Sequence, residues 1–361
     1  MITRRNLLKG TAVTGVVAAT GALSMPAVAQ GARIKLGYVS PQSGPLAAFA
    51  EAVDVVTYEF ENIPTAALDL LERRRPIRPG RRALATSQDR VAEKTFLSEI
   101  GLRVAPWAAV SDRAGLDAAL ARIGAPAILK TTRLGYDGKG QARIDGPQDA
   151  DAALAMMQGA DAVLEGFVHF SREVSVIAAR GLDGSVAAFD PGENVHRDGI
   201  LRSTTVPARL GAAERADAVL IAARILNALD YVGVIGVELF VTPDGLVVNE
   251  IAPRVHNSGH WTIEGAETSQ FQNHLRAVLG LPLGSTRAIG VSCMLNWIGE
   301  LPAAEAVLSE PCGHWHDYGK TPRAGRKVGH ATLRADGALD LAGALQRVGA
   351  GLGREQQVAA V

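Results

Sequence analysis

The sequence predicts a fold of mixed helices and strands that is divided into several units. Helical and strand-like segments alternate from about residue 85 to about residue 281, a strong turn joins two apolar runs near residue 244, and a helical pattern closes the chain. A chain of 361 residues exceeds the usual domain size of about 100 to 200 residues, so we expect two or three domains.

The first 30 residues have the pattern of an export signal. Arg4 and Arg5 precede a weakly apolar stretch over residues 10–25, and residues 27–29 form a small-residue cleavage signature. Glycines within the apolar stretch disfavour the alternative of an ordinary first helix. We therefore predict a twin-arginine signal over residues 1–30.

Residues 31–52 form a second segment, distinct in pattern from the rest of the chain. The run Arg33–Leu46 resembles the first strand and loop of a periplasmic solute-binding protein of the branched-chain amino acid type. The likeness stops near Ala52, because Val53–Phe60 begins a buried strand that leads into another pattern. We infer a junction between about Pro45 and Val53.

The next elements are predicted from apolar spacing and cap residues. After Pro64, apolar residues at 67, 68, 70 and 71 predict a short helix that ends at the arginine run 73–75. Residues 87–90 predict the cap of a helix that runs through Ile100, so a new unit begins near residue 85. Residues 287–296 are strand-like, and a last helix begins near Leu339.

The composition excludes several classes of partner. Lys+Arg and Asp+Glu both total 37, so no overall field attracts nucleic acid or an anionic membrane. No apolar run reaches the roughly 20 residues of a membrane span. Cys293 and Cys312 show neither metal-binding spacing nor a disulfide framework, and we expect two free thiols.

A glycine-rich loop is the first candidate site. The apolar strand Ala127–Leu129 ends in Lys130, and the loop Gly135–Gln141 comes next with three glycines in six positions. Glycines free the backbone N–H groups to approach an anion, while Lys130 and Lys139 add the positive charge that a polyphosphate requires. The alternative is a hairpin turn whose lysines are solvated.

Two glutamates on a predicted hairpin form the second candidate site. Apolar runs flank the turn Thr242–Gly245, and a turn centred on Asp244 would place Glu238 opposite Glu250. Facing carboxylates repel each other, and apolar flanks increase that cost. A Mg²⁺ ion bound between the two carboxylates would offset this repulsion. The alternatives are a one-residue shift of register, which would separate the two glutamates, and a solvated hairpin face, on which no metal is required.

The loop after this hairpin is rich in hydrogen-bond donors. Arg254 can neutralise an oxyanion, and Asn257, Ser258 and a nearby glycine N–H can orient one. Two interpretations of His256 and His260 stay open, namely a role in the site and packing within the fold. Glu165, at the end of a predicted strand, could bind an adenine amino group or a ribose hydroxyl, although such a residue is usually solvated.

Four blocks of sequence together resemble one enzyme family. They are Tyr58–Asn62, Gly135–Gln141, Asn249–Trp261 and Gly325–His330. They occur in the order seen in the N5-carboxyaminoimidazole ribonucleotide synthases of purine biosynthesis, and the likeness runs from about Val53 to the end of the chain.

The resemblance implies an α/β and α+β fold class, with an ATP-grasp fold, and it implies a ligase reaction. A truncated pre-ATP-grasp α/β domain would occupy residues 53–85, the ATP-grasp domain residues 86–282, and a small C-terminal domain residues 283–361. ATP and Mg²⁺ would convert bicarbonate to carboxyphosphate, which would carboxylate 5-aminoimidazole ribonucleotide. The resemblance also implies a homodimer and a cytoplasmic location, although the signal at the start of the chain favours a periplasmic one.

The resemblance also implies a role for each matching residue. ATP would contact Arg90, Lys130, Gly135, Tyr136, Asp137, Gly138, Lys139, Gly140, Gln141, Glu165, Gly166, Phe167, Val168, Glu173, His196, Asn249 and Glu250. The metal would bind Glu238 and Glu250. Arg254 and Lys327 would be catalytic, and the ribonucleotide would contact Glu59, Tyr136, Lys139, Asn257, Ser258, Arg326 and Lys327.

One part of the family pattern is missing. The family opens with a βαβ unit whose glycine-rich turn binds the phosphate of the ribonucleotide, and Ser40–Gly44 does not reproduce that turn. We therefore hypothesise an intact ATP site beside a damaged ribonucleotide site. The functions to distinguish are a working ligase, a nucleotide-binding remnant that could be exported, and a solute-binding protein suggested only by the first 50 residues.

Overall fold

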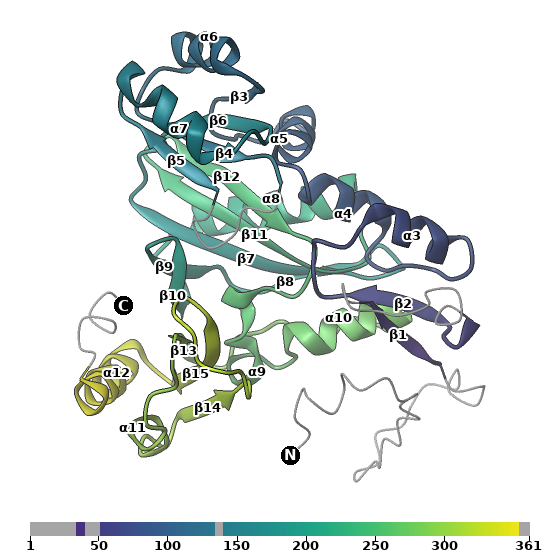
Figure 1. The fold of residues 1–361 in the computed structure, drawn as a ribbon. Helices are drawn as coiled ribbons and strands as arrows, with labels where there is room; N and C mark the ends of the chain where they lie inside the picture. Colours follow the sequence, from purple (N-terminus) through teal and green to yellow (C-terminus); the bar gives the residue numbers. More distant parts are fainter. Residues whose placement is uncertain (1–33, 40–50, 134–139, 354–361) are drawn as a thin grey trace.

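The structure, a computed structural model, describes residues 34–39, 51–133 and 140–353 (Figure 1). Its strands form a two-stranded, a four-stranded and a nine-stranded sheet. Among the described residues, no helix combines the length and the apolar composition needed to cross a membrane. Cys293 and Cys312 are both free thiols, as predicted.

The first unit is a small α/β layer. Strands β1 (Leu36–Val39) and β2 (Val55–Tyr58) pair in parallel, and helices α3 (Thr65–Glu72) and α4 (Arg81–Ser87) come after them. All four residues of β2 are buried, and Val56 and Tyr58 share a core with Leu68 and Leu84. The predicted strands and the helix after Pro64 are confirmed. The predicted junction falls mostly at residues 40–50, outside the described residues.

Helix α4 was not predicted, because its first residue follows Gly80, which offers no side-chain cap. Helix α5 (Arg90–Glu99) does begin where the sequence indicated. Its cap is Asp89, whose Oδ1 accepts hydrogen bonds from the N–H groups of Val91 at 3.0 Å and Ala92 at 3.1 Å. Ser87 instead ends α4, so the segment 87–90 separates two helices.

The four-stranded sheet carries two helices on one face (Figure 1). Its order is β3-β6-β4-β5, and all neighbours are antiparallel. Apolar residues of α6 and α7 pack with the inward-facing residues of the strands. The elements are β3 (Trp107–Val110), α6 (Arg113–Ile123), β4 (Ala127–Thr131), β5 (Gln141–Ile144), the 3-10 helix η2 (Pro147–Asp149), α7 (Ala150–Met156) and β6 (Ala162–Gly166).

The nine-stranded sheet has the order β12-β11-β7-β9-β10-β13-β15-β14, with β8 beside β7. The strands of its first half are β7 (Arg172–Arg180), β8 (Val186–Ala188), β9 (Gly192–Arg197), β10 (Ile200–Val206), β11 (Gly233–Thr242) and β12 (Gly245–Ala252). Helix α8 (Ala212–Ala228) packs against β7, β11 and β12 through one apolar cluster. Trp261 packs in a separate cluster with Ile177 and Val234.

The later elements extend the same sheet. They are the 3-10 helix η3 (Asn257–Gly259), α9 (Thr262–Gly265), α10 (Gln270–Leu279), β13 (Val291–Ile298), α11 (Glu305–Leu308), β14 (Gly313–Asp317), β15 (Lys327–Ala335) and α12 (Ala338–Leu352). Strand β13 pairs with β10, so the sheet continues across the boundary predicted at residue 282. The strand near residues 287–296 and the helix near Leu339 are confirmed, while the domain limits remain a prediction.

Candidate active site

The hairpin of β11 and β12 brings Glu238 directly opposite Glu250. The turn is tighter than the sequence indicated, because Thr242 pairs with Gly245 and the turn is not centred on Asp244. From that turn, regular pairing would place Asn249 opposite Glu238. A β-bulge at Asn249 adds one residue to β12 and restores the predicted pair.

The two carboxylates have unlike environments. Burial and the charge of Glu250 raise the pKa of Glu238 to about 7. Burial has the same effect on Glu250, but Arg90, 3.4 Å from its Oε2, and Lys130 hold the pKa of Glu250 below its ordinary value. Two ionised carboxylates this close together repel each other. A divalent cation that binds oxygen ligands would offset this repulsion.

His256 contacts Glu238 without neutralising it. Its Nε2 is 3.4 Å from Glu238 Oε1, and burial lowers the pKa of His256 to about 3, so the ring is neutral. Among the described residues, no group of three or more His, Cys, Asp or Glu side chains could hold a metal. A Mg²⁺ at Glu238 and Glu250 would therefore complete its shell with water and phosphate oxygens.

Glu165 is buried, in contrast to the solvated alternative. It lies within β6, is 4% exposed, and its Oε2 is 3.1 Å from Lys130 Nζ and 3.4 Å from Lys94 Nζ. Burial opposes its ionisation, but Lys130 and Lys94 lower the pKa of Glu165 to about 2. Its Oε1 has no hydrogen-bond partner among the described residues, which fits an acceptor for a ligand N–H or O–H.

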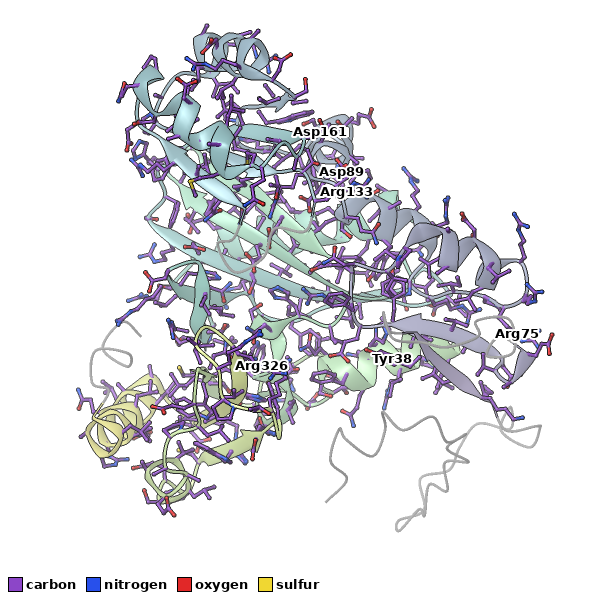
Figure 2. The ribbon with its side chains drawn as sticks, in the orientation of Figure 1. Tyr38, Arg75, Asp89, Arg133, Asp161 and Arg326 are labelled. Atoms are coloured by element: carbon purple, nitrogen blue, oxygen red, sulfur yellow. The ribbon has the colours of Figure 1, made fainter. Side chains whose placement is uncertain are left out.

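The segment between β4 and the glycine-rich loop is anchored to the start of α5. Arg133 Nε lies 3.1 Å from Oδ2 of Asp89, the cap of α5, and Figure 2 shows both side chains beside the four-stranded sheet. Gly140 has φ +68°, and a Cβ there would lie 2.7 Å from Thr131 Oγ1, so the position requires glycine. Gln141 pairs with Lys130. The predicted residues Gly135, Tyr136, Asp137, Gly138 and Lys139 lie outside the described residues.

Glu173 and His196, which the resemblance predicts to contact the nucleotide, lie beside the glutamate pair. His196 Nδ1 is 2.8 Å from Glu173 Oε2, and β7 carries Ser175 opposite Glu238. Burial works against protonation of His196, but Glu173 and Glu238 raise the pKa of the ring. Gly166, Phe167 and Val168 continue from Glu165 at the end of β6 and are partly buried.

Arg254 is held by a residue of the first unit. Its Nη2 lies 2.9 Å from Glu61 Oε1, and burial of the guanidinium is outweighed by Glu61, which raises the pKa of Arg254. Glu59 is exposed at the end of β2 and also acts on Arg254 electrostatically. The Tyr58–Asn62 segment thus meets the donor-rich loop.

The C-terminal strand β15 completes this side of the site. Lys327 Nζ donates to Asn257 Oδ1 and lies 3.2 Å from His260 Nδ1. The Tyr318 hydroxyl lies 2.9 Å from His260 Nδ1 and 2.7 Å from His330 Nδ1, so it links the two histidines. Arg326, labelled in Figure 2, precedes Lys327 and donates to the Thr321 carbonyl oxygen at 3.2 Å. The structure therefore brings Lys327 and Asn257 together, while the side chain of Arg326 bonds the Thr321 carbonyl oxygen.

Ser258 differs from its neighbours. It is 1% exposed, and its hydroxyl lies 2.7 Å from Ser175 Oγ and 2.8 Å from His256 Nδ1. The side chain packs the loop onto β7. Its predicted contact with the ribonucleotide is not supported by this placement and remains a prediction.

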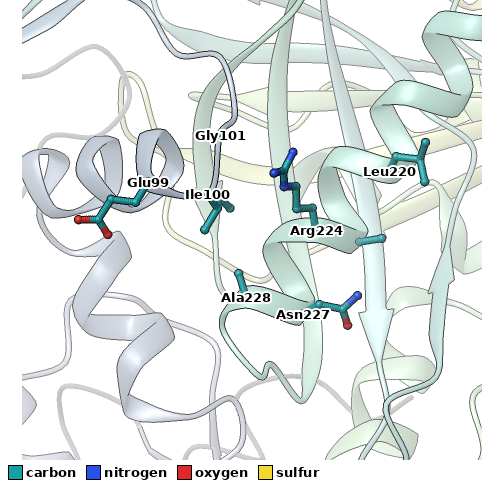
Figure 3. Close-up of a pocket in the computed structure, with 8 residues that line it drawn as sticks. Glu99, Ile100, Gly101, Leu220, Arg224, Asn227 and Ala228 are labelled. Carbon is teal, nitrogen blue, oxygen red and sulfur yellow. The ribbon is translucent and has the colours of Figure 1, made fainter.

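A shallow pocket of about 730 Å³ lies between the end of α5 and α8 (Figure 3). Glu99, Ile100, Leu220, Arg224 and Asn227 are among its lining residues, and those residues include none of the predicted site residues. The candidate site is a different region, formed by β4, β6, β11, β12 and the loop after β12.

Sequence reasoning missed four residues that contact the site: Glu61, Glu93, Lys94 and Tyr318. Glu93 and Lys94 are charged residues on the buried face of α5. Their apolar neighbours Phe96 and Leu97 were a usable signal, since buried charges need partners.

Comparison with known proteins identifies the class first. The ATP-grasp domain family matches residues 95–271, the ribonucleotide synthetase preATP-grasp family residues 19–88, and the C-terminal domain of phosphoribosylaminoimidazole carboxylase residues 292–342. The twin-arginine signal family matches residues 1–21. With Glu238 and Glu250 facing each other on β11 and β12, the fold is that of an ATP-grasp ligase.

Individual relatives narrow the class. The chain is 50% identical over 305 residues to the N5-carboxyaminoimidazole ribonucleotide synthase of Brucella melitensis, covering 83% of this chain and 84% of the relative. The Pseudomonas aeruginosa enzyme of the same name is 48% identical over 285 residues, which is 79% of each chain. The protein belongs to the N5-carboxyaminoimidazole ribonucleotide synthase family.

Solved structures agree with this assignment. The synthetase of Thermus thermophilus has a TM-score of 0.81 at 50% identity, covering 84% of this chain and 83% of that one. The Aspergillus clavatus synthase, solved with ADP and 5-aminoimidazole ribonucleotide, has a TM-score of 0.79 at 32% identity and covers 87% of this chain and 84% of that one.

Proposed function

We propose that the protein uses ATP to carboxylate 5-aminoimidazole ribonucleotide with bicarbonate, giving N5-carboxyaminoimidazole ribonucleotide, ADP and phosphate. The observation that carries the proposal is the register of β11 and β12, which sets Glu238 opposite Glu250 beside Arg90 and Lys130. Family membership supplies the reaction, and the roles of individual residues are proposals.

The residues present fit a Mg²⁺–ATP complex. Glu238 and Glu250 would hold the metal, which supplies neutralisation of phosphate charge. Lys130 and Arg90 would contact phosphates, and the free Oε1 of Glu165 would accept from the base or ribose. Glu173, His196 and Asn249 lie beside this region and would complete the nucleotide contacts.

Chemistry would take place at the loop after β12. A bicarbonate oxygen attacks the γ-phosphorus, the bond to ADP breaks, and carboxyphosphate forms near Arg254, whose guanidinium would balance its charge. Carboxyphosphate then releases phosphate, and the exocyclic amine bonds to the carboxyl carbon and loses a proton. Lys327 and Asn257 would orient the ribonucleotide and keep water from the intermediate.

ATP turnover by the full chain tests this function directly. ADP release should require both bicarbonate and 5-aminoimidazole ribonucleotide, and it should fall below detection in Glu250→Gln, which removes one negative ligand. The exposed substitution Glu99→Gln is the control. Turnover that ignores either substrate, or that survives Glu250→Gln, would overturn the proposal.

A second candidate, a nucleotide-binding remnant with impaired turnover, is favoured by the first unit. Among the described residues, its sheet consists of β1 and β2, with a single bridge from Val56 to Ile77. Calorimetric titration separates the two functions: ADP binding with no measurable binding of 5-aminoimidazole ribonucleotide would favour the remnant.

Location and assembly are further proposals. We place the reaction in the cytoplasm, where its substrates are made, and propose a homodimer in solution. The twin-arginine match at residues 1–21 supports the alternative of export. Cleavage after Ala29 in fractionated cells would favour export, and the molar mass by light scattering tests the dimer.

A further inference from the structure

Two side chains of helix α5 hold the backbone of strand β12 on either side of Glu250. Lys94 Nζ donates to the Asn249 carbonyl oxygen at 2.8 Å, and the Ile251 N–H donates to Glu93 Oε1 at 2.7 Å. Both side chains come from α5, and both are buried, at 2% exposure for Glu93 and 1% for Lys94. Consecutive residues of α5 therefore contact the backbone of the residues immediately before and after a proposed metal ligand.

These contacts are made at the part of β12 where regular strand pairing is interrupted. Strand β12 is the last strand at one end of the nine-stranded sheet, and the bulge at Asn249 interrupts its pairing with β11. Edge strands and bulges leave backbone groups without a partner strand, and a buried N–H or C=O without a partner destabilises the fold. The Val248 N–H bonds the Arg103 carbonyl oxygen at 2.8 Å. Beyond Val248, side chains of α5 take the place of a neighbouring strand.

The bulge decides which side chain stands opposite Glu238. Leu239 pairs with Val248, so uninterrupted pairing would bring Asn249 to Glu238 and turn Glu250 to the other face of the strand. The bulged conformation has to be held for the two glutamates to meet. The contacts from Glu93 and Lys94 are made to Ile251 and Asn249, which enclose Glu250.

Lys94 also reaches the other sheet. Its Nζ lies 3.4 Å from Glu165 Oε2, so one ammonium group joins the Asn249 carbonyl of β12 to the carboxylate of β6. This contact orients Glu165 and leaves its Oε1 without a partner among the described residues. The proposed metal pair and the proposed base or ribose acceptor thus share one buried support.

We propose that Glu93 and Lys94 are positioning residues of the metal–nucleotide site. They hold the bulged backbone of β12 that sets Glu250 opposite Glu238, and Lys94 in addition orients Glu165. This inference rests on the proposed metal role of Glu238 and Glu250. Glu93 acts through the peptide backbone, and Lys94 acts through the backbone and through Glu165.

Three substitutions on α5 separate positioning from general stability. Glu93→Leu removes the acceptor for the Ile251 N–H at similar volume, whereas Glu93→Gln keeps a carbonyl oxygen. Glu99→Gln is the matched control, because Glu99 is exposed on the same helix. The measurements are Mn²⁺ binding in the presence of ADP by electron paramagnetic resonance, ADP binding without divalent cation by calorimetry, and hydrogen exchange of the β12 amides.

The expected results differ between the variants. Glu93→Leu should weaken Mn²⁺ binding by about tenfold and speed exchange at residues 249–251, because one buried donor loses its partner. Glu93→Gln should stay within about threefold of the unchanged protein, and Glu99→Gln should match it. Metal-free ADP binding should be the same in all three. Lys94→Met should weaken both Mn²⁺ and ADP binding, since Lys94 also orients Glu165.

Two outcomes would overturn the inference. One is Mn²⁺ binding of unchanged strength in Glu93→Leu, and the other is a parallel loss of Mn²⁺ and metal-free ADP binding in that variant. If Glu93→Leu does not fold, Lys94→Met decides, and unchanged Mn²⁺ binding there contradicts the inference. Mn²⁺ binding is also measured in Glu238→Gln and Glu250→Gln. If these two variants retain Mn²⁺ binding, the proposed metal site is wrong as well. If they lose it while the α5 variants keep it, only the positioning role is wrong.

Discussion

Arg254 depends on a residue that is distant in the sequence. Glu61 lies after β2, whereas Arg254 lies after β12, and the two side chains meet at 2.9 Å. Burial works against the charge of Arg254, and Glu61 both supports that charge and fixes the direction of the guanidinium. The first unit therefore affects the proposed carboxyphosphate site through one carboxylate.

Glu61→Gln tests this dependence. The amide keeps an acceptor but removes the negative charge, so we expect bicarbonate-dependent ATP turnover to fall about tenfold, as for the loss of one charged hydrogen bond. ADP affinity, measured by calorimetry, should not change. Glu72→Gln, an exposed carboxylate of α3, is the control. Unchanged turnover, or an equal loss of ADP affinity, would contradict the prediction.

At the scale of elements, the hairpin of β11 and β12 shows which features could be predicted from the sequence and which could not. The turn residues and the two apolar runs predicted β11 and β12, but the pairing of Glu238 with Glu250 also depends on a bulge. The bulge at Asn249 could not be predicted, because the backbone groups on either side of Glu250 bond Glu93 and Lys94 of α5, a helix that is distant in the sequence. The predicted pair was correct although the predicted turn centre was wrong.

Strand β11 also has to lie close to the donor-rich loop. A Cβ at Gly236 would come within 2.7 Å of both Cβ and Cγ of His256, whose ring is held by Ser258. Gly236→Ala should displace His256 from Glu238 and destabilise the protein by about 1–3 kcal/mol. We expect a melting temperature about 2–6 °C lower by calorimetry.

Gly80→Ala is the matched control for this substitution. Gly80 has φ −68°, and a Cβ there would meet no atom within 4 Å. Its melting temperature should stay within about 1 °C of the unchanged protein. Equal shifts in the two variants would show that close approach at Gly236 is not the cause.

At the scale of the whole molecule, alternation of helices and strands predicted a mixed fold of several units, but it did not predict the connections between the units. The sheet that carries Glu238 and Glu250 continues through β10 into β13 and β15, so Lys327 reaches the loop after β12. Pairings between distant strands leave no local sequence signal. The family motifs, in contrast, selected Arg254 and Lys327 as site residues, and their catalytic roles remain predictions.

His274 joins the first unit to the central sheet and should make the stability of the molecule depend on pH. On α10, its Nδ1 accepts from the Val234 N–H of β11 at 3.2 Å, and its Nε2 lies 2.9 Å from Thr57 Oγ1 of β2. Accepting at Nδ1 requires the neutral ring with its proton on Nε2. Burial lowers the pKa of His274 to about 4, so the folded protein keeps this form through neutral pH.

The sign of the effect is set by proton uptake. The ordinary histidine pKa is about 6.5, so between pH 6.5 and 4 the unfolded chain binds a proton that the folded protein excludes, and stability falls as the pH falls. The contribution of His274 is largest above about pH 6.5 and is lost toward pH 4, an effect on the order of 3 kcal/mol. His274→Asn keeps an acceptor for Val234 and removes the titrating group. Its deficit in melting temperature should therefore be greatest at pH 7.5 and should narrow at pH 5, whereas a constant deficit would mean that His274 serves only as packing between the two units.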